Sequence, residues 1–239
     1  MKTLNNTLFV TGTDTGVGKT CISRALVDYF VSQGERVAPL KPVASGSAIR
    51  DGVLQNDDAL ILMHAANIAL EYSAINPYVF KEPIAPHIAA AKSQVQIDIH
   101  YLNQCHQRLA DKADRVIVEG AGGWQVPLTK ALSMADWVAQ QQWPVILVVG
   151  LRLGCINHAR LTYLDMMAKK MPLAGWVVNT IDADVLESEA IIADLLHFIK
   201  APLLGVVPWL GNGNKAEEAV FTPDMRQYLD FSLLPCVRR

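Results

Sequence analysis

A glycine-rich segment near the start of the sequence, GTDTGVGKT at 12–20, contains the residue types that hold a phosphate group. It follows the apolar run Leu8-Phe9-Val10 and precedes a helical pattern of apolar residues over 22–30. A strand that turns through glycines into a helix directs backbone N–H groups and the positive end of the helix dipole at an anion. There Lys19 reaches the outer phosphates, and the Thr20 hydroxyl ligates the Mg²⁺ that accompanies them. The predicted nucleotide contacts in this segment are Gly16, Val17, Gly18, Lys19, Thr20 and Cys21.

The spacing inside this segment differs from that of an ordinary phosphate loop. The glycine expected five positions before the glycine of Gly-Lys-Thr is here Thr13, and the available glycine is Gly12, one residue further back. Asp14 and Thr15 lie where such loops are mostly small and neutral. A glycine-rich turn with a surface lysine is the alternative interpretation. The strand before the segment and the helix after it favour nucleotide binding.

A second lysine stands at the end of the next apolar run, in the sequence KPVASGS at 41–47. Pro42 restricts its own backbone and that of Lys41, so the lysine is held on a stiff segment. At the carboxyl edge of a sheet, Lys41 would neutralise transferred phosphate charge or orient an anionic substrate. Ser45 would donate a hydrogen bond to the same substrate. A solvated loop lysine is the alternative.

Acidic residues stand at two further places where a metal ligand would be useful. Asn56-Asp57-Asp58 opens a helix, so that Asp57 or Asp58 makes the N-cap while the other carboxylate is free to reach a metal. Glu119 ends an apolar strand, a position at which phosphate-loop proteins place an acid that holds Mg²⁺ directly or through water. A lone solvated glutamate is the alternative. The glycine-rich run Gly120, Ala121, Gly122 and Gly123 leaves room for a phosphate or a substrate.

Three later segments with possible ligand contacts also follow predicted strands. The sequence LGCINH at 153–158 begins a helix, and the free N–H groups of a helix start suit a carboxylate. His158 has no evident carboxylate partner nearby, so we interpret it as a structural or interface histidine. Asn179-Thr180 and Pro208-Trp209-Leu210 end the last two predicted strands, where they would frame a purine ring.

The composition argues against several classes of protein. At 239 residues, with 51% hydrophobic and 18% charged side chains, the chain fits one large domain or two small ones. A formal charge of −2 without a basic run argues against nucleic acid as a partner. The longest apolar run, 145–151, is too short to span a membrane, and we expect no signal or transit peptide. Four scattered cysteines without metal-type spacing predict reduced thiols and a cytoplasmic location.

Short apolar runs alternate with longer amphipathic stretches along the chain. That alternation predicts an α/β fold with a doubly wound, mainly parallel sheet and helices on both faces. We expect a single domain over 1–239, with the C-terminal part, 211–239, peripheral. Ligands collect at the carboxyl ends of the strands in such sheets, and each polar cluster above falls at such an end. The predicted strands are 8–11, 36–44, 115–119, 144–150, 173–179 and 202–208; the predicted helices lie near 19–33, 57–70, 98–113, 133–142, 155–171 and 185–199, with a weaker one near 215–230.

Eight sequence segments, in one consistent order, cover much of residues 8–210. They are GTDTGVGKT (12–20), KPVASGS (41–47), NDDAL (56–60), VEGAGGW (118–124), PVILVVG (144–150), LGCINHA (153–159), AGWVVN (174–179) and APLLGVVPWL (201–210). Together they resemble the dethiobiotin synthetase family, and such coverage is far more specific than a nucleotide loop alone. The resemblance implies a P-loop NTPase-like three-layer sandwich and an ATP- and Mg²⁺-dependent ligase. It also implies a homodimer with the substrate near the interface.

The resemblance further implies a reaction and a set of roles. In it, 7,8-diaminononanoate and CO₂ give a carbamate, ATP phosphorylates the carbamate, and the second amine closes the ureido ring of dethiobiotin. Lys19 and Lys41 would be the catalytic cations, and Asp58 would join Thr20 and Glu119 as a Mg²⁺ ligand. The implied substrate contacts are Thr15, Lys41, Ser45, Gly122 and Gly123 for the diamine or carbamate, and Leu153, Gly154, Cys155 and Asn157 for the distant carboxylate; the implied further nucleotide contacts are Asp58, Glu119, Gly120, Ala121, Gly122, Asn179, Thr180, Pro208, Trp209 and Leu210.

One position departs from the family pattern, and two other kinds of protein share parts of it. Gly16 stands where many members carry a larger, often acidic residue, which bears on nucleotide affinity and selectivity. The first alternative is an ATPase switch that positions DNA or division machinery; such proteins usually carry an early loop lysine, and 13–17 has none. The second is the synthetase half of an amide-transferring ligase, which we expect to require a further glutaminase domain.

Overall fold

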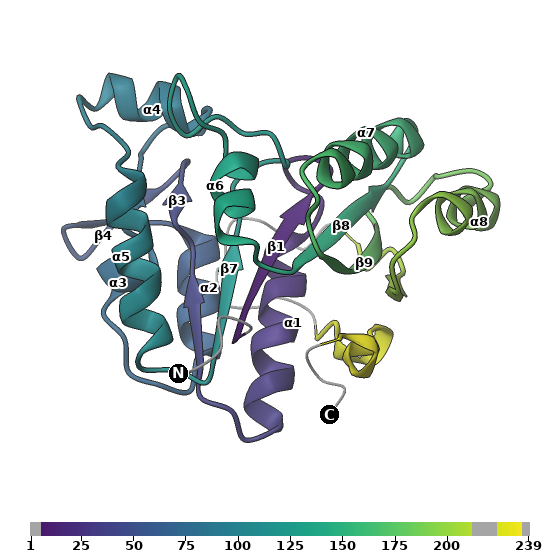
Figure 1. Cartoon of the computed structure of the whole chain (residues 1–239), viewed down its shortest axis with the longest axis horizontal. Helices are drawn as coiled ribbons and strands as arrows, with labels where there is room; N and C mark the ends of the chain where they lie inside the picture. Colours follow the sequence, from purple (N-terminus) through teal and green to yellow (C-terminus); the bar gives the residue numbers. More distant parts are fainter. Residues whose placement is uncertain (1–5, 212–223, 236–239) are drawn as a thin grey trace.

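Six strands form the central sheet of the computed structural model, which describes residues 6–211 and 224–235 (Figure 1). Their order is β10-β9-β8-β1-β7-β2, and each neighbouring pair is parallel. The carboxyl ends of all six strands therefore meet at one edge, as the sequence predicted. The strands are β1 (Thr7–Gly12), β2 (Val37–Leu40), β7 (Arg115–Glu119), β8 (Val145–Leu151), β9 (Leu173–Thr180) and β10 (Leu203–Val207).

Helices cover both faces of this sheet. Successive strand residues point to opposite faces, so Phe9 packs into one apolar core while Leu8 and Val10 pack into the other. The core around Phe9 also contains buried residues of α5 to α8, and the core around Leu8 contains those of α1. The predicted doubly wound, three-layer sandwich is thus confirmed. The helices are α1 (Lys19–Ser32), α2 (Asp57–Ala65), α3 (Tyr72–Ile75), α4 (Pro86–Lys92), α5 (Ile99–Ala110), α6 (Met134–Gln141), α7 (Cys155–Ala168) and α8 (Ser188–Phe198).

The predicted strand 36–44 was wrong as a single element, since it divides at Lys41. β2 ends at Leu40, and residues 43–44 form β3 (Val43–Ala44), which pairs with β6 (Tyr78–Val79) in a separate small sheet. Pro42 lacks the N–H that a continuing ladder needs, which favours this break. Lys41 therefore lies between two sheets.

Other differences concern short elements and helix ends. The sequence analysis did not predict α3, α4 or the hairpin of β4 (Ala48–Arg50) and β5 (Val53–Gln55). The predicted helix 57–70 ends at Ala65, because the next residue, Ala66, is extended.

The predicted helix 215–230 lies largely outside the described residues. Over residues 224–235 the chain forms two short 3-10 turns, η2 (Arg226–Tyr228) and η3 (Phe231–Leu233), instead of an α-helix. Met225, Phe231 and Leu234 are buried in the same core as α1. Among the residues that the structure describes, no helix is long and apolar enough to cross a membrane.

Candidate active site

The glycine-rich loop after β1 is hydrogen-bonded to the end of β9. Gly16 and Gly18 have φ angles of 73° and 91°, in the left-handed region that glycine adopts readily. The Asn179 amide nitrogen, at the end of β9, donates a hydrogen bond to the Val17 carbonyl at 2.9 Å. A Cβ atom on Gly18 would collide with that same nitrogen. Gly18 is therefore required by its backbone conformation and by Asn179, in addition to any close approach of a phosphate.

The Lys19 side chain folds back onto the backbone of this loop. Its Nζ atom donates to the Asp14 carbonyl at 2.9 Å, and the residue is only 7% exposed. Burial, followed by the positive charge of Lys41, lowers the pKa of Lys19 to about 8. A phosphate placed at this ammonium would compensate for the stabilisation by water that the charge loses on burial.

A salt bridge ties the loop to the segment that precedes α7. Arg152 Nη2 lies 2.6 Å from Asp14 Oδ2, and the Thr15 backbone N–H donates to Asp14 Oδ1 at 2.7 Å. Thr15 itself is exposed. No local sequence pattern predicts this partner of Asp14, since the two residues are 138 positions apart.

A buried cluster of opposite charges lies beside the loop, at the ends of β2 and β7. Lys41 Nζ is 2.5 Å from Glu119 Oε1 and 3.1 Å from Asp58 Oδ2, and it donates to the Gly120 carbonyl at 3.2 Å. The Thr20 hydroxyl, on the first turn of α1, donates to Glu119 Oε1 at 2.9 Å. Lys41 is 3% exposed and Glu119 is fully buried. The fold thus brings together four residues that the sequence assigned to phosphate chemistry.

The charges in this cluster stabilise one another. The Lys41 ammonium lowers the pKa of Asp58, which favours its carboxylate form. Burial alone would lower the pKa of Lys41, but the carboxylates of Glu119 and Asp58 outweigh it and raise that pKa. The lysine is therefore charged at neutral pH, and the carboxylates of Glu119 and Asp58 balance its charge.

The donor set fits Mg²⁺. Glu119 Oε2 is buried and makes no hydrogen bond to any described residue, so it is a carboxylate oxygen in need of a partner. Asp58 and the Thr20 hydroxyl add oxygen ligands of the kind Mg²⁺ prefers. No described group of three or more His, Cys, Asp or Glu side chains forms a cage for a metal. Two carboxylates and a hydroxyl suit a Mg²⁺ ion that phosphates and water also ligate.

The prediction that Asp57 or Asp58 caps α2 was wrong. The cap is Asn56, whose side-chain oxygen accepts hydrogen bonds from the Asp58 and Ala59 N–H groups at 3.1 Å and 3.4 Å. Asn is among the favoured N-cap residues, so the sequence contained this signal. Asp57 instead pairs with Arg50, which leaves Asp58 to face Lys41.

The predicted substrate contacts near Lys41 differ in exposure. Ser45 has a buried hydroxyl without a hydrogen-bond partner among the described residues, as does Ser47. Gly122 has a φ of 60°, and a Cβ atom there would lie 3.6 Å from the Thr15 hydroxyl. Thr15 of the glycine-rich loop and Gly122 therefore lie close to each other.

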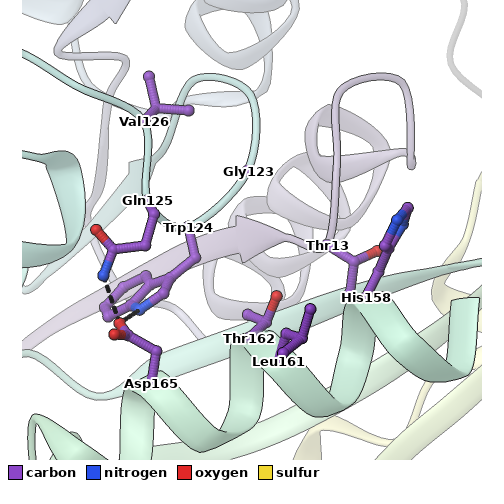
Figure 2. A pocket seen from close by; sticks show the side chains of 9 residues that line it. All are labelled: Thr13, Gly123, Trp124, Gln125, Val126, His158, Leu161, Thr162 and Asp165. Atoms are coloured by element: carbon purple, nitrogen blue, oxygen red, sulfur yellow. Dashed lines mark hydrogen bonds between the residues drawn. The ribbon is translucent and has the colours of Figure 1, made fainter.

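A groove of about 330 Å³ opens between the 123–126 segment and α7 (Figure 2). Trp124 Nε1 and Gln125 Nε2 both donate to Asp165 Oδ2, at 2.7 Å and 2.6 Å, which ties the segment to the helix. His158, interpreted from sequence as structural, lines this groove. The sequence analysis predicted Gly123 at this place but not its other lining residues: Thr13, Trp124, Gln125, Val126, His158, Leu161, Thr162 and Asp165.

The start of α7 presents most of its predicted substrate residues to solvent. Leu153 is 94% exposed, Asn157 is exposed, and Gly154 occupies the N-cap with a φ of 89°. Cys155 is buried in the core, and its backbone N–H donates to the Arg152 carbonyl. The Cys155 side chain thus faces the protein interior.

The residues predicted to frame a purine lie at adjacent strand ends. β9 and β10 pair with Val207 opposite Asn179, so Thr180 and the segment 208–210 share one end of the sheet. Trp209 and Leu210 are 37% and 40% exposed. Cys21 is half-buried in α1, and burial raises the pKa of its thiol to about 11.

The sequence matches known proteins over most of its length. A family described as AAA domain matches residues 6–216. ATP-dependent dethiobiotin synthetase BioD 1 of Salmonella typhi is 48% identical over 203 residues, covering 85% of this chain and 89% of that protein. The chain belongs to the dethiobiotin synthetase family. A dethiobiotin synthetase of Yersinia pestis is 43% identical over 233 residues, 97% of this chain and 96% of that protein. This synthetase is accordingly an ATP-dependent ligase of biotin biosynthesis that acts on small molecules.

Solved structures show the same fold at low sequence identity. The MinD cell division protein of Aquifex aeolicus is 14% identical with a TM-score of 0.53, and the match covers 98% of the synthetase and 92% of that chain. MinD of Pyrococcus horikoshii, solved with Mg-ADP, is 16% identical with a TM-score of 0.52 over 85% and 81% of the two chains. These likenesses confirm the α/β fold of the chain, with its mainly parallel central sheet.

Proposed function

We propose that this enzyme forms dethiobiotin from 7,8-diaminononanoate, CO₂ and ATP, and that it does so as a cytoplasmic homodimer through a carbamate and a carbamic–phosphoric anhydride. The observation that carries the proposal is the charge cluster of Lys41, Glu119, Asp58 and Thr20 beside the phosphate loop. An anionic carbamate that attacks an anionic phosphate needs cations already in place, because repulsion otherwise opposes the approach.

Lys19 and Lys41 would act on the two sides of the transferred phosphoryl group. Lys19 would exchange its bond to the Asp14 carbonyl for the outer phosphates of ATP. Lys41, fixed on the side of Glu119, would hold the carbamate oxygen near phosphorus. In this step the carbamate oxygen forms a bond to the γ-phosphorus, the β,γ-bridging bond breaks, and ADP leaves.

Thr20, Asp58 and Glu119 would hold the Mg²⁺ ion. When bound, Mg²⁺ neutralises charge on the β- and γ-phosphates. Glu119 supports this assignment because its second carboxylate oxygen is buried without a described hydrogen-bond partner.

Ring closure would require positioning more than protein acid–base chemistry. The free amine attacks the anhydride carbonyl, the bond from that carbon to the phosphate oxygen breaks, and phosphate leaves as the nitrogen loses a proton. Both reacting groups belong to one substrate molecule, so an effective concentration gain accounts for much of the rate. Ser45, Thr15 and the glycines at 122–123 would bracket this end of the substrate, and no covalent protein nucleophile is needed.

A second copy of the chain would cover the other end of the substrate. On α7 the apolar side chains Leu161, Leu164 and Met167 are 60%, 53% and 37% exposed, close to the very exposed Leu153. Apolar area of this kind supports association with a partner. The substrate carboxylate would then lie at the start of α7, near Gly154 and Asn157, where the positive end of the helix dipole favours an anion.

The proposal is tested by mass-spectrometric detection of the cyclic urea after incubation with diaminononanoate, bicarbonate and ATP. We expect ATP turnover to require both the diamine and bicarbonate, and one ATP to be consumed for each ring closed. Equal ATP turnover without the diamine would favour an ATPase switch and would reject the proposal. Boiled enzyme, and reactions without bicarbonate, serve as controls.

A further inference from the structure

Lys41 is attached to a backbone that the central sheet does not hold. β2 pairs with β7 as far as Leu40, opposite Val118, and Lys41 follows at the break between the two sheets. Because Lys41 is buried, its own N–H and C=O groups need partners from elsewhere. Both come from the end of α3. The Lys41 N–H donates to the Ile75 carbonyl at 2.8 Å, and the Asn76 side chain donates to the Lys41 carbonyl at 2.7 Å.

Asn76 is the central residue of a buried polar chain. It is 2% exposed, and its amide nitrogen also donates to the Tyr78 carbonyl at 3.2 Å. Its side-chain oxygen accepts a hydrogen bond from the Tyr72 hydroxyl at 2.8 Å. The amide is thus engaged at both ends, which fixes its orientation.

Tyr72 extends this chain to the helix that carries Asp58. Its hydroxyl accepts a hydrogen bond from the Asn56 backbone N–H at 2.8 Å. The Asn56 side chain in turn caps α2 by accepting from the Asp58 N–H, and its amide nitrogen donates to the Ser45 carbonyl at 3.4 Å. Consecutive hydrogen bonds therefore lead from the backbone of Lys41 to the backbone of Asp58.

We propose that Asn76 and Tyr72 are positioning residues that hold Lys41 and Asp58 at the spacing required for phosphoryl transfer. The inference rests on the proposed function, because it gives Lys41 and Asp58 their roles there. Neither Asn76 nor Tyr72 touches Lys41 Nζ or the Asp58 carboxylate, and each acts through backbone. The 3.1 Å contact between those two charges joins the end of β2 to a separate helix, α2. The ion pair alone would allow these two elements to shift, and the chain of hydrogen bonds fixes their relative position.

The test compares two Tyr→Phe variants. Tyr72→Phe removes the hydroxyl that joins Asn76 to Asn56 and keeps the ring. Tyr78→Phe is the matched control, because its hydroxyl likewise accepts one backbone hydrogen bond, from the Asp98 N–H at 2.9 Å, but on the side of α5. The measurements are kcat, KM and the Mg²⁺ concentration for half-maximal rate. Calorimetry adds the Mg²⁺ dependence of binding for a non-hydrolysable ATP analogue, and hydrogen exchange covers the segments 41–44 and 56–60.

For Tyr72→Phe we expect kcat to fall and the half-saturating Mg²⁺ concentration to rise, each by about tenfold. Calorimetry should likewise show that the ATP analogue needs a higher Mg²⁺ concentration to bind, and hydrogen exchange should be faster in both segments. KM for ATP at saturating Mg²⁺ should stay unchanged. Tyr78→Phe should lower the melting temperature without altering kcat or the Mg²⁺ dependence. Equal values of kcat and Mg²⁺ dependence in the two variants would overturn the inference.

A second variant breaks a different hydrogen bond of the same chain. Asn76→Asp keeps an oxygen acceptor for the Tyr72 hydroxyl but removes the donor to the Lys41 carbonyl, so kcat should fall here as well. A wild-type enzyme that makes no cyclic urea would reject the proposed function. The calorimetric and exchange comparison of Tyr72→Phe with Tyr78→Phe would still decide the positioning inference, because it requires no turnover.

Discussion

Two regions of the candidate site are built in different ways. One is the phosphate end, which consists of the loop at 12–20 and the charge cluster of Lys41, Glu119, Asp58 and Thr20, and the other is the groove beside α7. At the phosphate end, Lys41 and Glu119 are buried and paired at 2.5 Å. Beside α7, the groove is open, and the adjacent Leu153 and Leu161 are 94% and 60% exposed. The proposed phosphoryl transfer requires charged groups that are oriented before the substrate arrives, because reorganising charges during the reaction is costly. Under the proposed function, the aliphatic chain of the substrate would need only apolar cover beside α7, which a second copy of the chain would supply.

The largest effect is expected from removing the cation of the phosphate end. Lys41→Met should lower kcat by about 100- to 1,000-fold, because the charge that stabilises the transition state is lost. It should also destabilise the fold by about 3–5 kcal/mol, since Glu119 would remain buried without its counter-charge. The rate of ring formation and the free energy of unfolding in urea are the measurements.

A double variant distinguishes these two consequences. Lys41→Met combined with Glu119→Gln removes both charges, so it should recover much of the stability and none of the activity. Activity near the wild-type level in either variant would exclude Lys41 from the site.

The next effect is expected at Asp58, with its neighbour Asp57 as an internal control. Asp58→Asn should reduce kcat about 10- to 100-fold and raise the Mg²⁺ requirement, because a predicted metal ligand loses its charge. Asp57→Asn breaks the pairing with Arg50 on the surface and should leave both quantities unchanged. Equal losses in the two variants would show that the first turn of α2, rather than the Asp58 carboxylate, matters. Initial rates across a Mg²⁺ titration give the answer.

Substitutions on α7 should act on substrate binding more than on chemistry. Leu161→Glu together with Leu164→Glu should weaken dimerisation by roughly tenfold or more, because leucines that the proposed dimer would bury become charged. KM for the diamine should then rise more than KM for ATP. Sedimentation velocity and steady-state kinetics measure the two effects, and Leu196→Glu on α8, at an exposed leucine, serves as the control. An unchanged association state would remove α7 from the interface.

The smallest effect on activity is expected at His106, which is buried at the opposite end of the sheet, with burial as the one cause that shifts its pKa among the described residues. Burial lowers its pKa from 6.5 to about 4, and its ring lies 2.9 Å from the Thr7 hydroxyl and packs on Trp143. Below about pH 6.5 the unfolded chain binds a proton at His106 that the folded protein does not bind. The stability that comes from burying the neutral imidazole is therefore fully present above that pH. It is lost as the pH falls toward 4, by roughly 3 kcal/mol in total.

His106→Gln keeps a polar partner for Thr7 and removes the titration. Urea unfolding between pH 4.5 and 7 should therefore show a flatter pH dependence in the variant, with activity at pH 7 retained. The same slope in both proteins would contradict the assignment. The contrast with Lys41 would be clear, because there burial is offset by two carboxylates.

Sequence patterns predicted the elements of the phosphate end well, and the residues assigned there lie together in the structure, while their chemistry stays a prediction. The apolar strands, the turn into α1 and the acid at the end of β7 are local patterns, and the parallel order of strands places their ends together. Sequence predicted the groove poorly. Its lining combines Thr13, the 123–126 segment and one face of α7, and no local pattern relates these segments.

The sequence by itself determined the α/β fold, the phosphate loop and the family, because periodicity, glycine placement and ordered motifs are local properties of the chain. The tertiary structure alone decided the partners of those residues. Asp14 pairs with Arg152, Asn179 holds the loop at Val17, and Lys41 lies between carboxylates from two other elements. It also decided that Asn76 and Tyr72 connect Lys41 to α2. Such contacts depend on which segments the sheet brings together, and side chains distant in sequence become neighbours only after that packing.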